Sequence, residues 1–405
     1  MQPDTSTEPV DLLALDDGHA LAIVERDGSL SAVPVVRAPG GWQRATAGDG
    51  TADALVRLLA QAPGHSSHGR FSVVSWTGRY LPGRERPITV DQTNESVIVG
   101  EQAVVKWATH LQPGPHPAPG RLAALTAAGF TAMPTPWGVV TWTPDHGDDT
   151  LVATVNGYLP GAVDGWTWAK DMFIATATSG DLSVVAATSR ALGTVVADLH
   201  TSLLGTSSRS TSHDAQRWRD SAFDTLAQAR LLAGPANALL LAEHAEDIER
   251  ILDGLSGLVD VPVLDAHGDL HVGQVLRADE LLVITDFDGN PVLPPAERVL
   301  PVPAAVDLAG ILQSLSHVAI VAATRGELEP ETLTEVDRVS RAELYGAYLD
   351  RLTQDGHADL HIDSALDAFR LQQVLREIVY AGRHLPRWMY VPDAALPALL
   401  TEMSR

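Results

Sequence analysis

The hydrophobic pattern of the chain changes character near residue 160. Before that point, short apolar runs rich in Val, Ile and Ala are separated by turn-forming residues, which is typical of strands. The clearest strand-like runs are 21–24, 31–36, 96–99 and 103–105. Helices are expected at about 51–62 and, after a Pro- and Gly-rich loop at 112–121, from about 122 to 128.

Beyond residue 163 the apolar residues recur at helical spacing. One stripe runs from Leu192 to Leu203 and another from Ile248 to Leu258, and both are expected to be core-facing. His200, at the end of the first stripe, is expected to be a packed or capping histidine. The pattern therefore predicts an α+β protein that is β-rich first and mainly helical afterwards. With 405 residues and 45% hydrophobic composition, the chain can bury one large core or two to three modest ones.

One polar segment carries most of the chemical information. It is His267-Gly268-Asp269-Leu270-His271-Val272-Gly273-Gln274, followed by an apolar run at 281–284 and by Asp286-Phe287-Asp288. Phosphoryl transfer requires metal ions that neutralise phosphate charge and a group that positions the acceptor oxygen. Asp269 is suited to accept the acceptor's proton, Gln274 and Asp286 to bind Mg²⁺, and Asp288 to bind a second Mg²⁺. A lone His-Gly-Asp is common in turns, but this combination favours a small-molecule kinase.

A single lysine stands out in the β-rich half. Of 28 basic residues only Lys106 and Lys170 are lysines, and Lys106 ends the second strand of a hairpin predicted around Gly100-Glu101. In kinases a lysine at such a position binds the α- and β-phosphates of ATP. We therefore expect Lys106 to contact the nucleotide, although an ordinary strand-end lysine is the alternative.

At these residues the chain resembles the aminoglycoside-phosphotransferase-like kinases, and among them the actinobacterial maltokinases and glucosamine kinases. The resemblance is carried by 91–97, Val104-Val105-Lys106, Asp164-Gly165-Trp166, 267–277 and Arg383-His384-Leu385-Pro386-Arg387-Trp388. It implies a two-lobed, eukaryotic-protein-kinase-like fold with an N-terminal cap, a β-rich small lobe and a mainly helical large lobe. It also implies ATP and Mg²⁺ as cofactors and a sugar as acceptor. In this superfamily an Asp at the position of Asp307 braces the catalytic loop.

Two features depart from the protein-kinase pattern. No Gly-x-Gly-x-x-Gly segment is present, so the turn Thr93-Asn94-Glu95-Ser96, with the Ser96 hydroxyl, is expected to cover the phosphates. In addition, no acidic residue occurs from Trp107 to Pro144, where the helix carboxylate that pairs with the lysine would lie. Either Asp286 alone orients Lys106, or another carboxylate does.

The resemblance suggests three segments: residues 1–90 as the cap, 91–160 as the remainder of the small lobe with the hinge, and 161–405 as the helical lobe. A plain extension of the small lobe is equally compatible with residues 1–90. The hinge is expected at 154–161, where Asn156 and Tyr158 are candidate adenine contacts; a simple linker is the alternative.

The acceptor site is expected where Asp269 can reach it. Aromatic faces and bidentate polar groups suit a sugar ring. The candidate substrate residues are His271, Asn290, Arg298, Arg376, Glu377, Tyr380 and Trp388. Glucosamine is favoured over maltose because the chain is short and acidic and has Asp288-Gly289-Asn290-Pro291 where maltokinases tend to have Glu-Gly-Glu-Pro. An aminoglycoside phosphotransferase and a regulatory pseudokinase are further alternatives.

Charge and composition limit the partners. A formal net charge of −23 argues against nucleic acid and anionic membranes, because like charges repel, and it attracts a cationic acceptor. The chain has no Cys, which excludes disulfides and thiolate metal sites. The N-terminal residues lack the features of a signal peptide. A cytoplasmic protein is therefore expected. The sequence leaves the oligomeric state open, with a monomer favoured.

Overall fold

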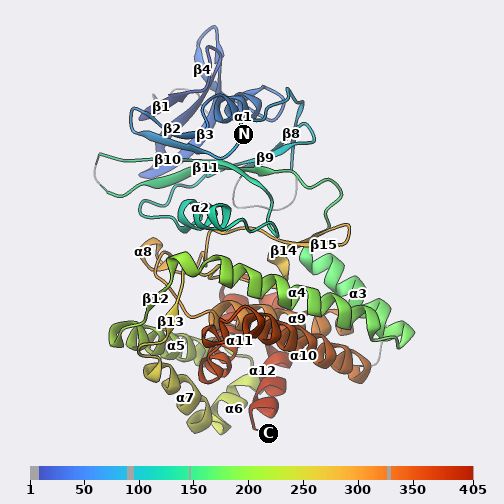
Figure 1. Ribbon diagram of the computed structural model, residues 1–405. Coiled ribbons are helices and arrows are strands. Elements are labelled where there is room, and N and C mark those ends of the chain that lie inside the picture. Colours follow the sequence, from blue (N-terminus) through green and yellow to red (C-terminus); the bar gives the residue numbers. More distant parts are fainter. Residues whose placement is uncertain (1–8, 89–94, 146, 326–329, 405) are drawn as a thin grey trace. The chain divides into compact units, whose positions relative to one another are not determined.

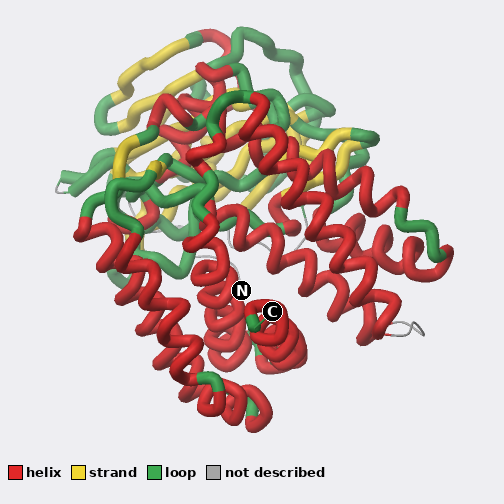
Figure 2. Tube along the Cα trace, turned by 60° about the horizontal axis from the view of Figure 1, so that its bottom comes forward, coloured by secondary structure: helices red, strands yellow, loops and turns green. Residues whose placement is uncertain are grey.

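The computed structural model describes residues 9–88, 95–145, 147–325 and 330–404. The chain divides into two compact units (Figure 1). The first comprises Met1–Thr126, Met133–Ala162 and Pro291–Val299, and the second Ala127–Ala132, Val163–Asn290 and Leu300–Arg405. Figure 2 shows the longer strands gathered in the first unit and the long helices in the second, as the hydrophobic pattern predicts.

The first unit contains two antiparallel sheets. The four-stranded sheet has the order β1-β2-β3-β4, with bounds Asp11–Ala14, His19–Arg26, Ser29–Ala38 and Gly41–Arg44. The seven-stranded sheet has the order β5-β6-β10-β11-β9-β8-β7. In chain order its strands are Gly64–His68, Phe71–Ser75, Glu85–Pro87, Glu95–Val99, Ala103–Trp107, Pro136–Trp142 and Thr150–Gly157. Strands β5 to β7 thus join the same sheet as β8 to β11, and a separate cap at 1–90 stays a prediction.

One hydrophobic core joins both sheets to helix α1, Thr51–Gln61. It contains Leu13, Leu21 and Ile23 from the first sheet, Leu55 and Leu59 from the helix, and Phe71, Val97, Val105, Trp107 and Val140 from the second. Gly138 on β10 lies against the helix, because a Cβ there would be 2.6 Å from a methyl group of Leu59. The predicted strands 21–24 and 31–36 and the helix at 51–62 are confirmed.

The predicted hairpin at 96–105 is also confirmed, as strands β8 and β9. Their register places Ser96 opposite Lys106. Thr93 and Asn94 lie outside the described residues. The helix predicted to begin near 122 begins earlier: α2 spans Pro117–Ala128. The Pro-rich start is compatible with a helix because the N–H groups of the first turn have no intrahelical partners, so prolines there lose no hydrogen bond.

The second unit is built mainly from helices. These are α3 Gly165–Ser179, α4 Ser183–Ser202, α5 Ser212–Leu232, α6 Pro235–Glu243, α7 Ala245–Asp253, α9 Ala305–Arg325, α10 Pro330–Gln354, α11 Asp363–His384 and α12 Tyr390–Met403. Two short pairs of strands accompany them: β12 Ser208–Arg209 with β13 Pro262–Val263, and β14 Val275–Ala278 with β15 Leu281–Ile284. The stripe at 192–203 lies on α4. The stripe at 248–258 begins on α7 and continues through the 3-10 helix η2, Gly254–Gly257.

Helix α9 is the central helix of this unit. It packs against α3, α10, α11 and α12. By length and composition alone, its segment Ala305–Thr324 could cross a membrane, but 72% of that window is buried within the protein. Its apolar character is therefore that of a core helix, and the predicted α+β fold with a β-rich and a helical part is confirmed.

Candidate active site

Helix α9 holds the catalytic loop from its first turn. The carboxylate of Asp307 accepts hydrogen bonds from the backbone N–H groups of His267 and Gly268, both at 2.8 Å. Asp307 is completely buried. Burial by itself raises the pKa of a carboxyl, but hydrogen bonds from His200 and Gly268 and the nearby imidazoles hold the pKa of Asp307 below its usual value. The expected brace is confirmed, and it is an ionised carboxylate.

Two further turns of α9 support the rest of the loop. The Ser314 hydroxyl accepts the N–H of Val272 at 2.9 Å. Gly310 allows the loop to approach closely, because a Cβ at that position would lie 2.3 Å from the carbonyl oxygen of Leu270. Residues 307, 310 and 314 are spaced so that they share one face of the helix. One stripe of α9 therefore fixes the loop along its length.

The start of α3 fixes the end of the same loop. Asp164 caps the helix by accepting the N–H of Thr167. A Cβ at Gly165 would lie 1.6 Å from the carbonyl oxygen of Val272, so no larger residue fits. The Trp168 indole donates to the carbonyl of Val275 at 2.8 Å. The structure thus explains the residues of the Asp164-Gly165-Trp166 segment, because this segment packs directly against the loop.

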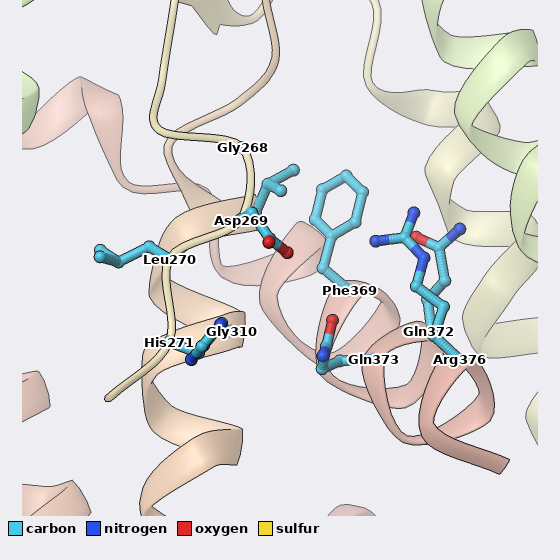
Figure 3. A pocket seen from close by; sticks show the side chains of 10 residues that line it. Gly268, Asp269, Leu270, His271, Gly310, Phe369, Gln372, Gln373 and Arg376 are labelled. Atoms are coloured by element: carbon cyan, nitrogen blue, oxygen red, sulfur yellow. The ribbon is translucent and has the colours of Figure 1, made fainter. Parts of the chain in front are cut away.

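Asp269 faces a pocket between this loop and α11 (Figure 3). The pocket has a volume of about 370 Å³ including its open mouth, and it is lined by Gly268, Asp269, Leu270, His271, Val306, Gly310, Phe369, Gln372, Gln373 and Arg376. Burial, followed by the negative charge of Asp286, raises the pKa of Asp269 to about 7, against the attraction of Arg376. A carboxyl with this pKa is poised to take up and release a proton near neutral pH.

The predicted metal ligands lie beside each other. The Gln274 amide donates to the Asp286 carboxylate at 3.4 Å. Asp286 is solvent-exposed and has a left-handed backbone with φ of 65°, an uncommon conformation for a residue other than glycine. Asp288 follows two residues later and is half-buried. In the part of the chain described, no three His, Cys, Asp or Glu side chains converge as metal ligands. Two carboxylates and an amide fit Mg²⁺, which keeps waters and phosphate oxygens among its ligands.

An aromatic cluster adjoins the pocket. Trp166 lies 6.2 Å from the ring of His271 and 6.1 Å from Trp388, and Trp388 lies 5.9 Å from Tyr390. His271 Nδ1 accepts the N–H of Gly273 at 3.0 Å. Burial, and to a smaller degree the neighbouring His267, lower the pKa of His271 to about 4. His271 is therefore a neutral imidazole with its Nε2–H as the donor.

The other predicted substrate residues differ in their positions. Arg376 lines the pocket, and Glu377 accepts a hydrogen bond from Gln373 at 3.4 Å and another from Trp388. Burial raises the pKa of Glu377. Tyr380 is 47% exposed. Glu377, Tyr380 and Trp388 are not among the residues that line the pocket.

Two candidates lie on the segment that follows the metal strand. Asn290 is buried but is not among the residues lining the pocket. Arg298, at the end of α8, Pro295–Arg298, belongs to the first unit and donates to the carbonyls of Leu293 and Pro291.

On α11, sequence reasoning missed three pocket residues: Phe369, Gln372 and Gln373. They precede Arg376 on α11 at spacings of seven, four and three residues, so they lie on the same face of that helix. The helical period around Arg376 was the signal that could have identified them. Gly310 and Ser314 were missed because their contacts with the loop do not change the hydrophobic pattern of helix α9.

The candidate nucleotide residues belong to the first unit. Lys106 is half-buried on β9 and pairs in register with Ser96 on β8 and Thr154 on β11. Asn156 lies near the end of β11. The backbone N–H of Tyr158 already donates to the carbonyl of Gln102 at 2.9 Å, and Arg86 lies over its ring. The N–H of Tyr158 and one face of its ring are therefore already engaged. Any contact of Tyr158 with adenine has to use its other groups.

Comparison with known proteins identifies the family. No family model matches the chain. A glucosamine kinase from Mycolicibacterium smegmatis (strain ATCC 700084 / mc(2)155) is 54% identical over 398 residues, covering 97% of this chain and 98% of that protein. The chain belongs to the glucosamine kinase family. A glucosamine kinase from Streptacidiphilus jiangxiensis is 41% identical over 401 residues, covering 96% and 91% of the two chains.

A solved structure agrees with this assignment. A glucosamine kinase in complex with glucosamine, ADP and inorganic phosphate superimposes with a TM-score of 0.87 at 38% identity, covering 98% of this chain and 96% of that one. The predicted resemblance and the predicted two-lobed kinase fold are therefore confirmed, and the chain is a phosphotransferase of the sugar-kinase type.

Proposed function

We propose that this protein transfers the γ-phosphate of ATP to a hydroxyl of glucosamine. The observation that carries the proposal is Asp269, a carboxylate with a pKa of about 7 that faces a pocket from a loop fixed by Asp307. The identity of 54% to a glucosamine kinase, and the similarity to one that binds glucosamine and ADP, support the choice of substrates.

Asp269 is the catalytic residue in this proposal. Its carboxylate orients the acceptor hydroxyl and takes its proton as the oxygen attacks the γ-phosphorus, while the bond from that phosphorus to the bridging oxygen breaks and ADP leaves. Gln274, Asp286 and Asp288 would hold Mg²⁺, which when bound neutralises phosphate charge. The contact between Gln274 and Asp286 supports this role, because it places an amide and a carboxylate side by side.

Nucleotide contacts come from the first unit in this proposal. Lys106 binds the α- and β-phosphates, and the Ser96 hydroxyl, opposite it on β8, adds a hydrogen bond. Asn156, near the end of β11, and Tyr158, just after that strand, contact adenine. The division into a cap at 1–90, a small lobe at 91–160 and a helical lobe at 161–405 belongs to the same proposal, as does a cytoplasmic, monomeric enzyme.

The acceptor's ammonium requires a carboxylate partner, because burying an unpaired charge is costly. Glu377 suits this role: burial raises the pKa of its carboxyl, so a buried cation beside it would stabilise the ionised form, and hydrogen bonds from Trp388 and Gln373 fix its position. Arg376 and His271 contact sugar hydroxyls from the pocket wall. Asn290, Arg298, Tyr380 and Trp388 complete the proposed set of substrate residues.

A substrate screen tests the proposal. ATP consumption should be measured with glucosamine, glucose, maltose and aminoglycosides, each with and without Mg²⁺. Glucosamine should give the highest kcat/KM, and mass spectrometry should detect a monophosphorylated amino sugar. Efficient phosphorylation of maltose would instead identify a maltokinase, and ATP binding without turnover of any sugar would favour a regulatory pseudokinase.

A further inference from the structure

A chain of buried polar side chains crosses the helical unit and ends at the catalytic loop. Tyr348 on α10, His200 on α4 and Asp307 on α9 are each completely buried. His200 Nδ1 lies 2.9 Å from the Tyr348 hydroxyl, and its Nε2 lies 3.3 Å from an oxygen of Asp307. That same oxygen accepts the N–H of His267.

The chemistry of the end groups sets the direction of these hydrogen bonds. The ionised Asp307 can only accept, so His200 Nε2 carries the hydrogen. In a neutral imidazole Nδ1 is then an acceptor, and the phenol of Tyr348 donates to it. Burial keeps the phenol protonated by raising its pKa. Tyr348 thus favours the one tautomer of His200 that can donate to Asp307.

The contact between α4 and α10 fixes Tyr348 in place. A Cβ at Gly193 would lie 2.1 Å from the carbonyl oxygen of Leu344, so the two helices approach with no room for a side chain. One turn earlier on each helix, the hydroxyls of Ser189 and Ser340 lie 2.8 Å apart. The phenol is therefore held against His200 by a rigid pair of helices, and the rings of Tyr348 and His200 meet edge to face at 5.6 Å.

We propose that Tyr348 is a positioning residue for catalysis: through His200 and Asp307 it holds the backbone of His267 and Gly268, and thereby the placement of Asp269. Neither the sugar nor ATP contacts Tyr348 in this proposal. The catalytic consequence rests on the proposed kinase function, but the effect on the loop itself does not.

Tyr348→Phe removes only the hydroxyl, and Tyr345→Phe is the matched control. Tyr345 lies on the same helix, but its hydroxyl contacts His361 and Asp363. Tyr348→Phe should lower kcat about tenfold while the KM for ATP stays within about twofold, because nucleotide contacts are untouched. Tyr345→Phe should leave both constants within about twofold of wild type.

Hydrogen exchange provides a readout that requires no substrate. The amides of His267 and Gly268 should exchange at least about fivefold faster in Tyr348→Phe, with little change in α5 or α7 and none in Tyr345→Phe. This comparison stands even if the substrate is another sugar. Faster exchange spread evenly over the helical unit, or unchanged exchange at the loop, would show that the phenol is only a packing group and overturn the proposal.

A double-variant cycle tests the route through His200. The amide N–H of the Gln in His200→Gln can donate to Asp307, but this side chain has no ring nitrogen at the Nδ1 position to accept from Tyr348. Adding Tyr348→Phe to His200→Gln should therefore cause less than about a twofold further loss of kcat. Independent losses that multiply in the double variant would contradict the proposed relay, as would wild-type kcat in Tyr348→Phe alone.

Discussion

Replacing Asp269 with Asn should make the protein less active and more stable, by an amount that depends on pH. The pKa of Asp269 is raised from 3.8 to about 7, so the folded protein retains a proton that the unfolded chain releases between these values. The folded state therefore loses stability as pH rises through this range, and the full penalty is present above pH 7. Asn carries no charge and avoids the penalty.

The size of the penalty follows from the shift. The rise of this pKa from 3.8 to about 7 corresponds to about 4 kcal/mol, since each tenfold change in the equilibrium is worth about 1.36 kcal/mol. Asp269 is partly exposed and Arg376 loses its partner in the variant, so about half of that is expected in practice. The advantage of Asp269→Asn in the free energy of unfolding should therefore widen by about 1 to 3 kcal/mol between about pH 5 and pH 8.

Urea unfolding of both proteins across this pH range measures the difference directly. In the same variant kcat should fall by roughly a hundredfold or more, while the calorimetric affinity for Mg-ATP should hardly change. For the wild type, kcat/KM should rise with pH through about 7 as Asp269 loses its proton. A stability difference that is constant with pH, or turnover of the variant within about threefold of wild type, would refute the reasoning.

Three further predictions concern metal, substrate and loop. Asp286→Ala should weaken Mg-dependent ATP binding more than Gln274→Ala does, because it removes a charged ligand and not a neutral one. Calorimetric titration of ATP with and without Mg²⁺ measures the difference, and unchanged affinity in Asp286→Ala would place the metal elsewhere. Glu377→Gln should lower kcat/KM for glucosamine by roughly one to two orders of magnitude and hardly affect glucose; equal losses on both sugars would indicate a structural role. Gly310→Ala should lower kcat at least about tenfold with ATP affinity retained, because its methyl group would displace the carbonyl of Leu270; wild-type kcat would show that the loop tolerates the shift.

Local sequence patterns predicted those helices and strands whose hydrophobic pattern matches the way they pack in the fold. The hairpin of β8 and β9 was recognisable because two apolar runs flank Gly100-Glu101, and Gly100 indeed has a positive φ of 57°. Helix α2 was placed too late because prolines and a glycine look like a loop. Their position in the first turn, where they cost little, becomes evident only when the helix is seen. The seven-strand order joins β6 to β10 across more than sixty residues, a pairing that no local pattern encodes.

Part of the candidate site could be predicted from the sequence because several of its residues are close together along the chain. Asp269, Gln274 and Asp286 lie within one segment, so their spacing along the chain constrains their spacing in the fold. The α11 wall of the pocket is contributed from about a hundred residues away, and only Arg376 was recognised among its lining residues. Polar side chains on a largely buried helix resemble packing residues until the loop they face is known.

The support around the catalytic loop explains how the fold tolerates Asp269. The carboxylate of Asp269 is largely removed from water and lies near the negative charge of Asp286, so any rearrangement that returns it to water is favourable. Three positions on one face of α9 oppose that rearrangement. Asp307 holds the amides of His267 and Gly268, Gly310 allows the close approach of the Leu270 carbonyl, and Ser314 holds the amide of Val272. Because these contacts involve the backbone and not the Asp269 side chain, they remain in place whether that carboxyl is ionised or protonated. The loop can therefore hold the Asp269 carboxylate in position although its ionisation is unfavourable, both before and after it takes up a proton. A carboxylate that activates a hydroxyl group requires this support.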